Sequence, residues 1–93
     1  MSVGINENIP GVTLNVYPNP TEGLLNVNTI FVNPENMQII VTDALGQIVY
    51  KTTPKTTIGE LTTIDLRSAS KGIYFVELKT EKGSVVKKVS LSN

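Results

Sequence analysis

The sequence predicts an all-β protein, an immunoglobulin-like β-sandwich of about seven antiparallel strands. Apolar and polar residues alternate with period two along most of the chain, which is the pattern of half-buried strands. Turn-forming residues recur roughly every 8–12 positions, a spacing typical of strand connections in such sandwiches. No segment carries the apolar stripe with a period of about 3.6 residues that an amphipathic helix needs.

The chain begins with a stretch that has no sustained period. Residues 1–12 carry Gly, Pro and Asn, so we expect a linker or entry segment there and a single domain at 13–93. Leu14 and Val16 alternate with polar neighbours and predict the first strand.

The stretch VYPNPTEG, at 16–23, ends this strand. Pro18 and Pro20 fix φ and lack an N–H, so neither a helix nor a central strand continues through them. Asn19 tolerates unusual dihedral angles, and Gly23 suits a position with positive φ. We interpret the stretch as a rigid corner that serves the fold first, with direct contact to another protein as the alternative.

Two further strands are predicted before the middle of the chain. Leu25 and Val27 belong to one, and residues 33–36 (NPEN) predict a turn after it. The next strand, at 37–42, places three apolar residues on one face, namely Met37, Ile39 and Val41.

Asp43 and Gly46 then predict a tight hairpin turn, type I followed by an αL residue, with a return strand at 47–51. Residues 52–59 are rich in Thr, Lys and Pro, which indicates a loop or irregular edge. Ile64 and Leu66 point inward from the next strand, at 62–66.

The C-terminal part predicts a corner at 68–72 and a hairpin. Its first strand, at 73–79, has Tyr74, Val76 and Leu78 on one face, and Gly83 closes the turn at 80–83. In the last strand, at 84–91, Lys87 interrupts an otherwise apolar face, so we expect a bulge or register shift there. Gly72 precedes the hairpin, and Tyr74 stands where immunoglobulin-like sandwiches place a tyrosine whose hydroxyl ties down the preceding corner.

The composition indicates no catalysis. The chain has no His and no Cys, which removes the commonest general base, the commonest transition-metal ligand and the thiol nucleophile. Its serines therefore have no histidine to activate them. Asp43 and Asp65 are better explained by a turn and a solvent-facing position than as a carboxylate pair. We expect no enzyme activity, no metal and no cofactor.

Charge is balanced overall but not along the chain. The net charge is zero, which gives no reason to expect a nucleic-acid partner. Residues 1–66 carry 2 basic and 6 acidic side chains, 2 − 6 = −4, and residues 67–93 carry 6 and 2, 6 − 2 = +4. Lys87 and Lys88 either contact a partner or guard an edge strand against association with other chains.

Several short segments stand in a characteristic order: YPNPTEG at 17–23, VTDALGQIV at 41–49, IDL at 64–66, GIYFV at 72–76 and, after Gly83, KKV at 87–89. In order and spacing they resemble the type A C-terminal sorting domain of the type IX (Por) secretion system of Bacteroidetes-type bacteria. Gln47 is a departure, since the family often has a basic residue there.

The resemblance implies a domain that directs a larger N-terminal cargo protein through the periplasm and across the outer membrane. Its partners would be the outer-membrane translocon shuttle and a sortase-like surface peptidase, which removes the domain in many members of the family and leaves it in place in others; the cargo ends secreted or at the cell surface. By this hypothesis the last hairpin is recognised, through Lys87, Lys88 and Val89.

Two other functions compete with this interpretation. One is a carbohydrate-binding or adhesive β-sandwich module, which would bind sugar at Tyr50 or Phe75. The other is a passive spacer like a fibronectin type III domain. Exposed edge strands would also allow a homodimer.

Overall fold

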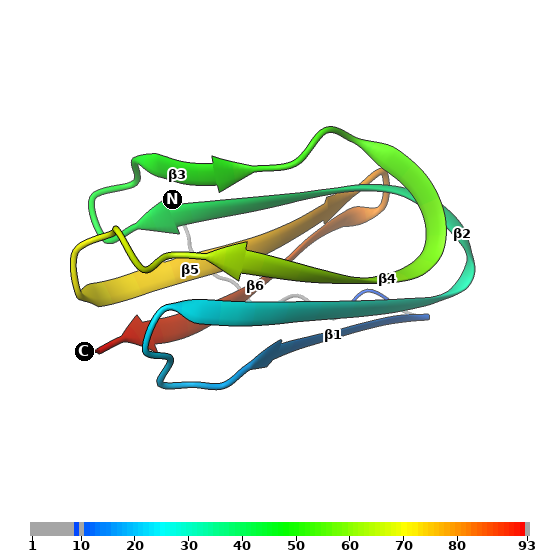
Figure 1. The fold of residues 1–93 in the computed structure, drawn as a ribbon. Helices are drawn as coiled ribbons and strands as arrows, with labels where there is room; N and C mark the ends of the chain where they lie inside the picture. Colours follow the sequence, from blue (N-terminus) through cyan, green and yellow to red (C-terminus); the bar gives the residue numbers. More distant parts are fainter. Residues whose placement is uncertain (1–8, 10, 93) are drawn as a thin grey trace.

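All regular structure among the residues that the computed structural model describes is β-strand (Figure 1). The structure describes Ile9 and residues 11–92. In chain order the strands are β1 (Val12–Tyr17), β2 (Leu24–Asp43), β3 (Ile48–Lys51), β4 (Lys55–Asp65), β5 (Gly72–Thr80) and β6 (Gly83–Leu91). Over these residues the chain has no helix of the length and hydrophobicity that a membrane span requires. The predicted all-β, antiparallel class is confirmed.

Strand β2 runs through both layers of the sandwich and connects them. Residues 24–30 pair with β1 on one side and with β4 on the other, whereas residues 37–43 pair with β5. Figure 1 shows β2 curving around one end of the molecule between these two parts. The first layer therefore holds β1, the start of β2 and the end of β4; the second holds β3, the end of β2, β5 and β6.

The turn predicted at 33–36 is wrong, because β2 runs through it. The ladder between β2 and β4 shifts between Ile30 and Glu35, and Pro34 lies inside this interruption. A proline cannot donate a hydrogen bond to a neighbouring strand, but its presence does not require a turn in which the chain reverses direction. The stretch 52–59, predicted as a loop or irregular edge, contains the start of β4, which begins at Lys55. This strand pairs with β2 alone and its ladder has a register shift, so the irregular edge is the alternative that the structure shows.

The core lies between the two layers and contains the predicted inward faces. Its fully or almost fully buried members include Leu25, Val27, Ile39, Val41, Ile64, Leu66, Tyr74, Val76, Leu78, Val89 and Leu91. Burying an aliphatic side chain of this size contributes about 1.5–3 kcal/mol. The two-residue period therefore selected the buried face correctly in each of these strands.

The bulge predicted near Lys87 is wrong. The ladder between β5 and β6 is regular from end to end, with Lys87 opposite the buried Val76. Lys87 thus starts from the core side of β6 and yet is exposed. The Lys87 side chain can be exposed although the neighbouring residues on that side are buried, because β6 is the last strand in its layer. The long side chain extends past the edge of the sheet into water.

The predicted boundary of the domain stays a prediction. Most of the expected entry segment, 1–8 and Pro10, lies outside the described residues. Ile9 is buried, and β1 begins at Val12, which pairs with Phe31.

Candidate functional site

The corner between β1 and β2 crosses from the first layer to the outer edge of β6 in the second. The Asn19 side chain donates from Nδ2 to the Lys88 carbonyl at 3.0 Å and accepts from the Ser90 amide at 3.0 Å. Thr21 continues the contact: its amide donates to the Ser90 carbonyl at 2.9 Å, and its carbonyl accepts from the Ser92 amide at 2.8 Å. The corner therefore acts as a short additional strand that clamps the end of β6.

Residues inside the corner hold its shape. Thr21 is fully buried, and its hydroxyl donates to the Leu24 carbonyl at 2.6 Å and accepts from the Gly23 amide at 3.1 Å. Gly23 has φ of 148°, and its carbonyl accepts from the Leu66 amide at 2.7 Å. A Cβ at Gly23 would run into Cγ of Arg67 and approach its Cα to 3.3 Å. The expected positive φ at Gly23 is confirmed.

The structural role predicted for VYPNPTEG is confirmed, but its partners were missed. Tyr17 ends β1, and the peptide bonds before Pro18 and Pro20 are both cis. Asn19 works through its side chain, which the sequence did not indicate. The sequence did not point to Thr21. Its role comes from hydrogen bonds to residues about 70 positions away, and no local sequence pattern indicates such contacts.

The two hairpin turns have the predicted chemistry. Asp43 Oδ1 accepts from the amides of Leu45 and Gln47, both at 2.9 Å, and Gly46 takes φ of 87°. At the far turn Thr80 pairs with Gly83, and the Thr80 hydroxyl accepts from the Lys82 amide at 3.0 Å. Each turn fixes the register of the strands that it joins.

The predicted tyrosine corner is confirmed. Tyr74 is 4% exposed, and its hydroxyl donates to the Ser70 carbonyl. Gly72 begins β5 between these two residues, with φ of 148°. The connection that precedes the C-terminal hairpin is therefore attached to the core.

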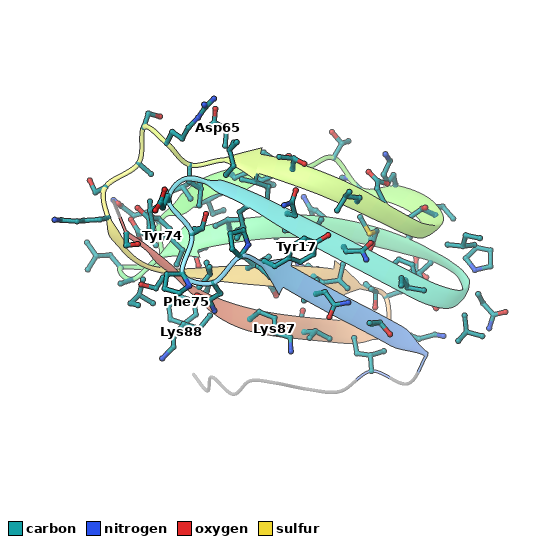
Figure 2. All side chains as sticks on the ribbon, turned by 60° about the horizontal axis from the view of Figure 1, so that its bottom comes forward. Tyr17, Asp65, Tyr74, Phe75, Lys87 and Lys88 are labelled. Atoms are coloured by element: carbon teal, nitrogen blue, oxygen red, sulfur yellow. The ribbon has the colours of Figure 1, made fainter. Side chains whose placement is uncertain are left out.

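The three residues expected to be recognised do not share a surface. Lys88 lies opposite Phe75 on the outer face of the second layer, whereas Lys87 lies opposite Val76 on the core side. Figure 2 shows Lys88 beside Phe75 and Lys87 farther along β6. Val89, opposite Tyr74, is fully buried and packs in the core. Successive residues of a strand face opposite ways, so the motif KKV is divided by the pleat.

With this geometry in place, a comparison with protein-family models finds a match over residues 15–92, to the family described as the secretion system C-terminal sorting domain. The chain belongs to this family. It carries the C-terminal sorting signal for type IX secretion, as the corner, hairpins and closing lysines had suggested. A search of the curated proteins finds no match.

Membership has direct consequences. The sorting domain is the C-terminal part of a cargo protein that the type IX system recognises, and its signal leads to the cell surface or to secretion. The family is not known for enzyme activity. Over the described residues, no group of three or more His, Cys, Asp or Glu side chains is placed to hold a metal ion.

Ion pairs in the sorting domain lie mainly at its surface. Lys55 binds Glu60 at 3.1 Å, Lys82 binds Glu35 at 2.8 Å, and Arg67 binds Asp65 at 2.9 Å. Hydrogen bonds from the Arg67 side chain and backbone lower the pKa of Asp65 to about 2. Within the described residues neither Lys87 nor Lys88 has a carboxylate partner, so their charges stay available.

The aromatic residues considered for sugar binding lie on different faces of the sorting domain. Tyr50 faces inward from β3 and lines a cavity of about 260 Å³, together with Met37, Thr52, Thr53, Pro54, Lys55, Glu60 and Thr62. Phe75 faces outward from β5. The two rings therefore do not form a common stacking platform.

Proposed function

We propose that the sorting domain acts as a folded label that the outer-membrane shuttle of the type IX translocon recognises through the last hairpin, residues 74–91. In this proposal the domain performs no chemistry, and recognition is its whole contribution to export. The observation that carries the proposal is the clamp on β6, which is bonded to β5 along one edge and, at its C-terminal end, to the corner at 19–21 along the other. A strand end held from both sides presents a preformed surface, which reduces the entropy lost on binding.

The charges of the hairpin support recognition by an acidic partner. Four lysines, at 79, 82, 87 and 88, stand against Glu77 and Glu81. Of these lysines, Lys82 is paired with Glu35 inside the domain. Charge complementarity of this kind increases the rate and specificity of association more than its strength.

We further propose the route that the family resemblance implies. The cargo precedes the domain, crosses the periplasm with it and passes the outer membrane, after which a sortase-like surface peptidase removes the domain. The entry segment at 1–12 is the proposed junction. The six described strands lie from Val12 onward and Ile9 is buried, so cleavage before Ile9 would leave the described sandwich whole.

A homodimer through edge strands would not use the end of β6. The corner already bonds to the backbone of Lys88, Ser90 and Ser92 along that edge. Association through edges would therefore involve β1, β3 or β4, each of which pairs with β2 alone among the described residues.

The test is export of a passenger. Residues 1–93 are fused to a fluorescent protein that folds in the periplasm, in a host with the type IX apparatus. We expect the passenger outside the outer membrane or on the cell surface, and its retention in the periplasm when the apparatus is deleted. A passenger retained in the competent host would refute the proposed function, and release of the domain by the host would support the cleavage step.

A further inference from the structure

The outer face of the second layer combines three apolar side chains, which lie around Glu77, with three lysines that form no ion pair among the described residues. We call it the apolar–lysine face and define it by seven residues of four neighbouring strands: Ile40, Lys51, Phe75, Glu77, Lys79, Val86 and Lys88. Register places Lys88 opposite Phe75, Val86 opposite Glu77, and Ile40 between Glu77 and Lys51.

The pleat decides that these residues point outward. Ile39, Val41, Val76 and Leu78 are fully buried, so their neighbours Ile40, Phe75 and Lys79 project to the opposite side. Phe75 is diagonal to both Ile40 and Val86, within the reach of an aromatic ring. All three apolar residues are half-buried although they face away from the core.

The charge of this face distinguishes it from the outer face of the first layer. Its three lysines form no ion pair among the described residues, and Glu77 is its one carboxylate, so its net charge is 3 − 1 = +2. The first layer's outer face also has exposed apolar residues, but its polar strand residues are mostly uncharged and its charged one is Asp65. The apolar residues are Tyr17, Leu24, Ile30 and Leu61, and the uncharged polar ones include Asn15, Asn26, Asn28 and Thr63. Figure 2 shows Asp65 on the opposite side of the molecule from Lys88.

We propose that the apolar–lysine face is the surface that docks on the export machinery, against a protein surface that combines apolar side chains with carboxylates facing Lys51, Lys79 and Lys88. This rests on the proposed function and divides the KKV motif: Lys88 makes the charged contact, whereas Lys87 does not face the partner. Asn19 is a positioning residue for the contact, because its side chain holds the Lys88 carbonyl and the Ser90 amide. The corner and the closing lysines thus serve one surface.

The experiment uses the fluorescent fusion with three single substitutions, each variant checked for its melting temperature. Lys88→Glu and Lys51→Glu reverse charge at opposite edges of the face. Lys87→Glu is the matched control, since it makes the same change one residue away on the other side of the strand. We expect export to fall at least about tenfold for Lys88→Glu and Lys51→Glu, because like charges across an interface cost several kcal/mol. Lys87→Glu should export like the unchanged domain.

Two results would overturn the inference: equal export of Lys88→Glu and Lys87→Glu, or export of Lys51→Glu at the unchanged level. A neutral variant, Phe75→Thr, tests the apolar contact without a charge change and should also reduce export. Failure of the unchanged fusion to be exported would instead contradict the proposed function, so the two failures are distinguishable.

Discussion

Asn19 bridges the two layers of the sandwich, and replacing it with Ala removes the side-chain part of the clamp on β6. Two hydrogen bonds are lost, to the Lys88 carbonyl and from the Ser90 amide, each 3.0 Å long. A hydrogen bond contributes about 0.5–1.5 kcal/mol net, and both lie at exposed positions where water replaces the lost partner. We therefore expect a loss of about 1–2 kcal/mol in the free energy of unfolding.

For a domain of this size, 1 kcal/mol corresponds to about 4–8 °C, so the melting temperature should fall by roughly 5–15 °C. Circular dichroism at the strand band measures this, and amide hydrogen exchange adds a local readout at Ser90. The control is Asn15→Ala on β1, since the Asn15 side chain is exposed and has no hydrogen bond among the residues that the structure describes. If Asn19→Ala melts like the control and Ser90 exchange is unchanged, the clamp contributes no stability and the reasoning fails.

Three further predictions concern single positions. Gly23→Ala should lower the free energy of unfolding, measured with urea, by about 1 kcal/mol or more beyond the loss caused by Gly72→Ala. Both glycines have φ of 148°, but an added Cβ meets Arg67 only at Gly23. Equal losses for the two variants would contradict this. Tyr74→Phe should lower the free energy of unfolding by about 1 kcal/mol or more, because the Ser70 carbonyl loses its hydrogen-bond donor. An unchanged urea midpoint would count against the tyrosine corner. Asp65 has a folded-state pKa of about 2, below its unfolded value, so its ion pair stabilises the domain above about pH 4 and is lost as the pH falls toward 2. The melting temperatures of Asp65→Asn and of the unchanged domain should differ at neutral pH and converge near pH 2. A difference that stays constant with pH would refute this.

Alternation predicted most of the buried faces because burial in a two-layer sandwich follows a period of two, which the sequence carries locally. Tyr74, Val76 and Leu78 are an example, since their even spacing alone places them in the core. The hairpin at 43–46 was predicted for a similar reason, because both Asp43 and Gly46 act within the turn itself.

The errors share one cause, which is that a local signal has more than one tertiary outcome. A proline that interrupts hydrogen bonding can lie in a turn or at a bend between two layers. Pro34 lies at such a bend, within β2. Lys87 on an apolar face indicates either a bulge or an edge strand, and only the strand order shows that β6 is at the edge.

By itself the sequence determined the all-β class, the inward faces of the strands, the two hairpin turns and, through its resemblance, the family. Only the tertiary structure decided that the YPNPT corner binds β6, that Thr21 is buried and that Lys87 and Lys88 face apart. The physical reason is sequence distance: alternation and turn chemistry act over a few residues, whereas Asn19 meets the Ser90 amide 71 positions away. Contacts of that range exist only once both layers have been assembled around the core.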